Sequence, residues 1–152
     1  MGVLSPKEVD VPPLENIVMP TVALNHLAIV TAAVLAFIVG GVWYGPLFGK
    51  AWMQENGLTP ETLATANQGK IYGLAFLFTL VMAYNLGFFL GDPSIGTSMG
   101  AAYGFATGFG WIAMAVFIIG LFERRSARLM LINGGYMTVT LTLMGLIIGL
   151  WR

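Results

Sequence analysis

The sequence contains no cysteine and one histidine, and only 9% of its residues are charged. The lack of cysteine excludes disulfides, thiolate catalysis and iron–sulfur ligation. A metal site normally needs three or four ligands, so we expect no metal site and no metal-binding residues. The charged fraction is far below the roughly 25% of an ordinary soluble domain, and this excludes a globule surrounded by water.

Long runs of one charge are also missing. Seven acidic and seven basic residues give a formal net charge of zero, and no basic run could follow a phosphate backbone, so nucleic acid is excluded as a partner. All of these charges lie outside four apolar runs or at their ends. No ionisable group is expected at mid-depth in a membrane, so we predict no catalytic residue, no enzyme and no proton-coupled transport.

What the sequence does have is apolar length, since 57% of its residues are hydrophobic. Four apolar runs cover residues 23–44, 71–90, 99–122 and 129–151, each close to the ~20 residues that cross a bilayer as a helix. Continuous apolar runs do not fit the alternating pattern of a membrane barrel strand. We therefore predict an all-α membrane protein, an antiparallel bundle of four transmembrane helices.

The domain organisation follows from these spans. Residues 1–22 contain four prolines and an acidic excess, which predicts an extended extramembrane tail, and residues 23–152 form the transmembrane domain. The tail has neither a basic n-region nor a small-residue cleavage site, so we expect the first span to be retained. In the first connection, residues 45–70, Thr59 is expected to cap a short helix that has Pro60 in its first turn.

Positive charge is distributed unevenly between the connections. The first and third connections carry five basic residues, whereas the other side carries two, Lys7 and Arg152. The positive-inside rule then places both termini on the outer side of the membrane. We expect the protein to be in a bacterial inner membrane.

Small residues recur at four-residue spacing in every span, which favours close helix packing. The third span has the clearest row, and its alternative interpretation is a pore or substrate groove. The predicted packing residues are Gly96, Gly100, Gly104 and Gly108 in the third span, Ala32, Ala36 and Gly40 in the first, Ala83 and Gly87 in the second, and Gly145 and Gly149 in the fourth.

A few polar residues near the span ends are candidate ligand contacts. His26 is interpreted as an interfacial hydrogen-bonding residue; the alternative is a proton relay or an axial ligand of a haem or chlorin pigment, although no cofactor is predicted. Asn85 and Asn133 are expected to form interhelical hydrogen bonds, or else to contact a polar ligand. Glu123 is expected to pair with Arg128 in a solvated cluster, with binding of an anionic headgroup as the alternative.

Aromatic residues gather at the span ends, where amphipathic rings are preferred. Trp43, Tyr44, Trp52 and Trp151 are interpreted as interface anchors. Trp111 is different because it lies in the middle of the third span, where its indole N–H needs a partner.

Two stretches resemble a known family. They are Gly40-Gly41-Val42-Trp43-Tyr44-Gly45-Pro46-Leu47-Phe48-Gly49-Lys50-Ala51-Trp52, and Leu121-Phe122-Glu123-Arg124-Arg125 followed by Ile132-Asn133-Gly134-Gly135-Tyr136 and Met144-Gly145. They are similar to the bacterial and fungal family called domain of unknown function 1761, over about residues 25–151. The resemblance implies a four-helix integral membrane protein, and it implies no activity, substrate or catalytic residue.

Three functions remain open. The leading hypothesis is an accessory or scaffolding subunit that packs against a larger membrane complex, respiratory or photosynthetic, with the lipid bilayer, other membrane subunits or a second copy as partners. The second is a small oligomeric transporter or channel lined by the third span and Asn85. The third is an enzyme acting on lipid or quinone, which we rank last because its reactive groups, His26 and Glu123, are expected about 30 Å apart.

Overall fold

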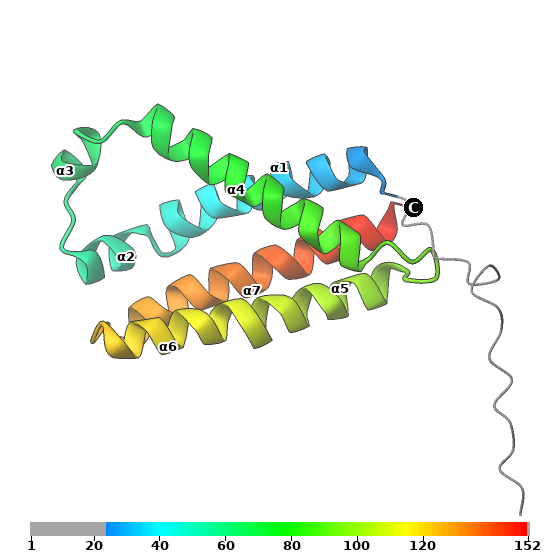
Figure 1. Cartoon of the computed structure of the whole chain (residues 1–152). Coiled ribbons are helices and arrows are strands. Elements are labelled where there is room, and N and C mark those ends of the chain that lie inside the picture. Colours follow the sequence, from blue (N-terminus) through cyan, green and yellow to red (C-terminus); the bar gives the residue numbers. More distant parts are fainter. Residues whose placement is uncertain (1–23, 152) are drawn as a thin grey trace, which may run out of the picture.

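A computed structural model describes residues 24–151 of the chain. In this part of the chain all regular structure is helical, and four helices are long and apolar enough to span a membrane: His26–Leu47, Gln68–Phe89, Thr97–Phe122 and Ala127–Leu150. They pack against each other with successive helices antiparallel (Figure 1). The predicted fold class is confirmed. The predicted tail, residues 1–22, and Arg152 lie outside the described residues.

The first span begins sharply and ends in an unusual turn. Asn25 caps α1 (His26–Val42), because its side-chain oxygen accepts a hydrogen bond from the backbone N–H of Ala28. The span continues as a π-helical turn, Trp43–Leu47, which contains Pro46. Proline has no N–H to donate within a helix, and here the N–H of Phe48 reaches back five residues to the carbonyl of Trp43, at 2.9 Å. The span thus ends three residues later than predicted.

The first connection holds two short helices, α2 (Gly49–Asn56) and α3 (Pro60–Ala64). Gly57 ends α2 in the left-handed conformation, with φ 64°. Thr59 caps α3, and Pro60 occupies its first turn, as predicted. A hydrogen bond from the Thr59 side chain lowers the pKa of the Glu61 carboxyl below its usual value.

The other three spans follow in order. The second is α4 (Gln68–Phe89), capped by Asn67. The third is α5 (Thr97–Phe105), a π-helical segment, Ala106–Ala113, and α6 (Met114–Phe122). The fourth is α7 (Ala127–Leu150), capped by Ser126. Between the third and fourth spans the chain turns through Arg124, which is left-handed with φ 56°.

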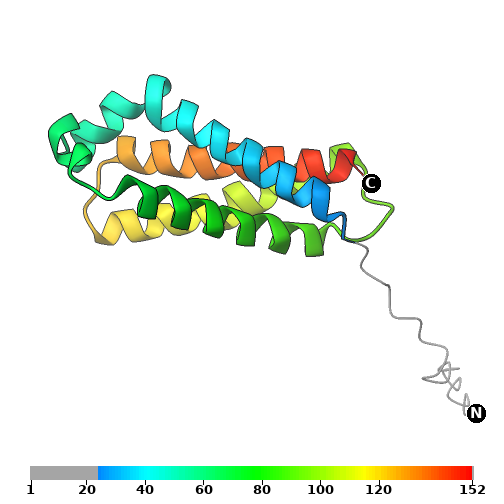
Figure 2. The same cartoon turned by 90° about the horizontal axis from the view of Figure 1, so that it is seen from above.

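The helix α7 occupies the centre of the bundle. It packs against α1 on one side and against α5, the π-helical segment and α6 on the other. The helix α4 packs mainly against α1, and these two helices lie together on one side of α7 and the third span (Figures 1 and 2). Accordingly, 39% of the most apolar stretch of α7 is buried, whereas this share is 17% for α4 and 17% for the third span.

The contact between the third span and α7 is made largely by backbone. A Cβ added to Gly100 would collide with the carbonyl of Gly145, and one added to Gly104 would collide with the carbonyl of Leu141. At Gly108 it would lie 2.8 Å from the Cα of Thr138. The absence of side chains allows these helices to approach so closely.

This backbone contact between the third span and α7, which we call the seam, continues beyond the predicted glycine row. Ala113 follows Gly108 by five residues, and a Cβ added to Gly134 of α7 would lie 3.2 Å from the Cβ of Ala113. A π-helical turn holds more residues than an α-helical turn, which keeps Gly108 and Ala113 on the same face. The four-residue spacing alone did not predict this extension.

The remaining predicted small residues lie in three different settings. Ala32, Ala36 and Ala83 belong to the buried core between α1, α4 and α7. Gly87 faces the side chain of Ile29, and Gly40 faces the ring of Tyr136, so neither meets a neighbouring backbone. Gly96 precedes α5 as its N-cap, and its carbonyl lies 2.8 Å from a Cβ added to Gly149.

Candidate functional site

Two hydrogen bonds attach the end of the first span to α7. The indole N–H of Trp43 donates to the carbonyl of Ile132, and the hydroxyl of Tyr44 donates to the side-chain oxygen of Asn133, both at 3.0 Å. Asn133 therefore makes the interhelical bond expected of it. Trp43 and Tyr44 were expected to be interface anchors, but their polar atoms turn inward, because the start of α7 offers acceptors at the same depth.

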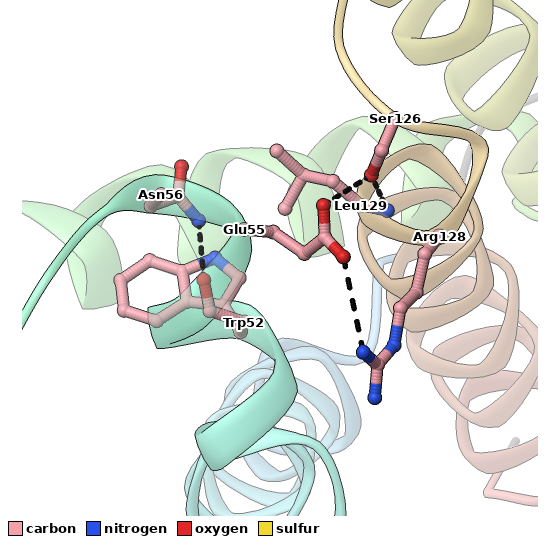
Figure 3. Close-up of polar contacts among 6 residues, drawn as sticks. All are labelled: Trp52, Glu55, Asn56, Ser126, Arg128 and Leu129. Carbon is pink, nitrogen blue, oxygen red and sulfur yellow. Dashed lines mark hydrogen bonds and ion pairs between the residues drawn. The ribbon is translucent and has the colours of Figure 1, made fainter.

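A second set of polar contacts attaches α2 to the start of α7 (Figure 3). The Ser126 hydroxyl hydrogen-bonds to the Glu55 carboxylate and also accepts the N–H of Leu129, at 3.1 Å. Arg128 lies 3.9 Å from the other carboxylate oxygen of Glu55. These contacts hold the first connection against α7 although 71 residues separate Glu55 from Ser126.

Trp52 contributes differently from the other predicted anchors at this end. Its backbone carbonyl accepts a hydrogen bond from the Asn56 side chain, at 2.8 Å (Figure 3). Its ring packs edge-on against Tyr44, with ring centroids 5.7 Å apart. The ring is therefore part of an aromatic contact between α2 and the end of the first span.

The predicted ion pair of Glu123 with Arg128 is wrong. Glu123 pairs with Arg125, with 3.1 Å between carboxylate oxygen and Nε, and both side chains are about half exposed. The left-handed turn at Arg124 brings Arg125 back beside Glu123, whereas Arg128 lies a turn further on, facing Glu55. Such an exposed pair contributes little to stability.

Glu123 and Asn133 nevertheless come together around one pocket. A cavity of about 220 Å³ at this end of the bundle is lined by Asn56 of α2, Glu123, Arg125 and Asn133, with Gly120 and Met130 among its apolar residues. It offers one carboxylate, one guanidinium and two amides to a small polar group. Within residues 24–151 no cluster of histidine and carboxylate side chains could hold a metal ion.

His26 and Asn25 lie at the opposite end of the bundle. The Nδ1 atom of His26 is 3.2 Å from the hydroxyl of Tyr84 on α4. The side-chain nitrogen of Asn25 donates to the backbone carbonyl of Trp151, at 3.0 Å, so the start of α1 is tied to the end of α7. His26 thus makes a hydrogen bond, which agrees with its interfacial interpretation, and it is far from Glu123.

The prediction that Asn85 makes an interhelical hydrogen bond is wrong. Its side-chain nitrogen donates to the carbonyl of Val81 in its own helix, at 2.9 Å, and the residue is exposed. Because α4 packs on α1 through another face, Asn85 points away from the helices that could have accepted the bond.

An apolar hollow of about 400 Å³ lies where α4 and the third span fail to meet. We call it the α4–α5 hollow; it is lined by Leu86, Phe89, Ile95, Tyr103, Thr107 and Trp111. Trp111 is 69% exposed near the middle of its span. No hydrogen bond from its indole N–H is formed within residues 24–151, although such a donor at mid-depth normally finds an acceptor.

Comparison with known proteins identifies a family without a known activity. A family model described as "Protein of unknown function (DUF1761)" matches residues 27–149 of this chain. No curated protein and no solved structure matches. The matched residues include all four membrane-spanning helices almost completely.

Proposed function

The chain belongs to the DUF1761 family of proteins of unknown function, and from that premise we propose that this small integral membrane protein is an accessory subunit that packs against another membrane protein. The observation that carries the proposal is the exposed position of Trp111 in the α4–α5 hollow. Within residues 24–151 no group of histidine and carboxylate side chains could hold a metal ion.

The shape of the hollow favours a helix as its occupant. A closed four-helix bundle would bury the facing sides of α4 and the third span against each other, but here α4 packs on α1 instead. The hollow is therefore concave, and it exposes large rings, with Phe89 at 69% and Tyr103 at 44%. We infer that a transmembrane helix of the partner lies against these walls and fills the hollow with its side chains.

The indole N–H of Trp111 in the hollow favours a protein over lipid as the occupant. Lipid tails contain no hydrogen-bond acceptor, and an unpaired polar group in an apolar environment costs about 1–3 kcal/mol. A partner helix with a serine or threonine hydroxyl, or a free backbone carbonyl, supplies the acceptor that residues 24–151 do not offer to the Trp111 indole.

The transporter alternative loses its two structural supports. The glycine row of the third span is in contact with α7, which leaves no pore along that face. Asn85, the other residue assigned to a pore, is exposed and donates its hydrogen bond to a carbonyl of its own helix.

The proposal is tested on native membranes solubilised in mild detergent. Wild-type protein is expected to migrate on a native gel with a larger complex, and Trp111→Leu is expected to lose this co-migration. Phe109→Leu is the matched control, because Phe109 lies in the same π-helical segment, is 46% exposed and is stacked on Phe105 outside the hollow.

Two results would contradict the proposal. One is migration of the wild-type chain alone or as a homo-oligomer, which would favour the transporter alternative. The other is equal loss of co-migration in Trp111→Leu and Phe109→Leu, which would show that the α4–α5 hollow is not the contact surface.

A further inference from the structure

A second cavity, separate from the α4–α5 hollow, lies between α1, α4 and α7 near the α2 end of the bundle. It encloses about 360 Å³, within the range of about 300–1,000 Å³ typical of small-molecule sites. We call it the tyrosine cavity. Its lining includes Phe37, Gly40 and Gly41 of α1, Tyr44, Tyr72 of α4 and Tyr136 of α7.

Two pairs of aromatic rings line the cavity. Phe37 meets Tyr72 edge-on, with ring centroids 6.2 Å apart. Tyr44 meets Tyr136 in the same manner, at 5.0 Å. These are favourable aromatic geometries, and they leave ring surfaces available to a flat ligand.

Beyond Phe37, the side of the cavity formed by the end of the first span is bare backbone at Gly40, Gly41 and Gly45. A Cβ added to Gly41 or to Gly45 would meet nothing within 4 Å, so the space in front of this wall is open. At Gly40 the neighbouring atom is the Tyr136 hydroxyl oxygen, 3.0 Å from an added Cβ. A planar ring can therefore approach the helix backbone. Any larger side chain at Gly41 would occupy this space.

Tyrosine hydroxyls supply the polar groups of the cavity. Tyr44 donates its proton to Asn133 and is engaged in holding the bundle together. The Tyr136 hydroxyl, beside Gly40, hydrogen-bonds with the Thr140 side chain, and by accepting from Thr140 it keeps its own proton for an acceptor on a ligand. Tyr72 also lines the cavity, and its phenol can donate as well. The lining contains no charged side chain, so the acceptor is expected to be neutral.

We propose that the tyrosine cavity binds the head of a quinone-class molecule, a flat, membrane-soluble ring with carbonyl oxygens. The ring would lie between the bare α1 backbone and the aromatic walls, and Tyr136 would donate to one carbonyl. A lipid acyl chain lacks both the planar shape and the acceptor. The inference is independent of the accessory-subunit proposal, because the cavity and the α4–α5 hollow share no residue.

Intrinsic fluorescence of the full chain in nanodiscs tests the site with decylubiquinone as the probe. Trp43 is the reporter beside the cavity, since its ring centroid is 6.3 Å from that of Tyr136 and quinones quench indole fluorescence. Trp52, Trp111 and Trp151 also emit, so only the saturable part of the quenching is assigned to the cavity. We expect saturable quenching in the wild type, an affinity at least about tenfold weaker in Gly41→Leu, and one about threefold to tenfold weaker in Tyr136→Phe.

Gly73→Leu is the matched control. Gly73 lies on α4, does not line the cavity, and has nothing within 4 Å of an added Cβ, so this variant should bind as the wild type does. Helix propensity favours leucine over glycine at both positions, and circular dichroism should show both variants folded.

Three results would overturn the proposal. The first is quenching in the wild type that rises linearly without saturation. The second is saturable quenching that Gly41→Leu leaves unchanged. The third is quenching of the wild type by a phospholipid with brominated acyl chains that Gly41→Leu weakens as much as it weakens quenching by decylubiquinone, because the cavity would then hold an acyl chain.

Discussion

The backbones of Gly100 on α5 and Gly145 on α7 are in direct contact, so that a Cβ on either residue would collide with the carbonyl of the other. This contact lies in the seam that joins the third span to the central helix. In a membrane, where lipid removes the hydrophobic drive for helix association, close packing of this kind supplies much of the stability.

Replacing Gly100 with alanine should therefore destabilise the bundle by roughly 2 kcal/mol, in the range of overpacking in a tight core. Gly73→Ala, which adds the same methyl group where nothing lies within 4 Å, should be neutral or stabilising by up to about 1 kcal/mol. Reversible unfolding in detergent measures both values. Equal stability of the two variants would mean that the seam is not as close as described.

The bond from the Tyr44 hydroxyl to Asn133 should couple the first span to α7. A double-mutant cycle of Tyr44→Phe and Asn133→Leu should give a coupling energy of about 1 kcal/mol, since interhelical hydrogen bonds in membranes are modest. A coupling energy indistinguishable from zero would show that the two residues do not interact in the bilayer.

Ser126 should matter more than Arg128, although both contact Glu55. Ser126→Ala removes the cap of α7 as well as the bond to Glu55, and should cost about 1 kcal/mol. Arg128→Gln removes only a long ion pair whose arginine is largely exposed, and should cost less than about 0.5 kcal/mol. Thermal unfolding of both variants orders the two effects, and the reverse order would contradict this assignment.

The positive-inside rule predicts which loops face the cytoplasm, and the lack of cysteine makes the prediction easy to test. A cysteine in place of Thr65, in the first connection, should react with a membrane-impermeant maleimide only after the cells are opened. A cysteine in place of Ser94, in the second connection, should react in intact cells. The opposite pattern would reverse the orientation.

Much of the fold could be predicted from the sequence because the bilayer requires it. A span must be apolar and about 20 residues long, and such runs are visible in any one sequence. Caps are equally local: Thr59 with Pro60 was recognised, and Ser126 could have been recognised by the same rule from its position before the fourth apolar run.

The polar contacts between distant segments could not be predicted in this way. Glu123 and Arg128 are close in the sequence, but the left-handed turn at Arg124 changes which side chains meet. The partner of Arg128 is Glu55, in another connection, and the helix faces that α4 presents depend on its packing against α1. Neither the pairing of Ser126 with Glu55 nor the inward turn of Trp43 leaves a signal in local spacing.

The central claim, that the α4–α5 hollow holds a helix of a partner subunit, is tested most directly by photocrosslinking in the native membrane. A photoreactive phenylalanine analogue is placed at Trp111 in one variant and at Phe109 in another, and the products are identified by mass spectrometry. The account predicts one defined membrane-protein adduct from position 111 and none from position 109. Adducts with lipid alone at position 111, or the same protein adduct from both positions, would contradict it.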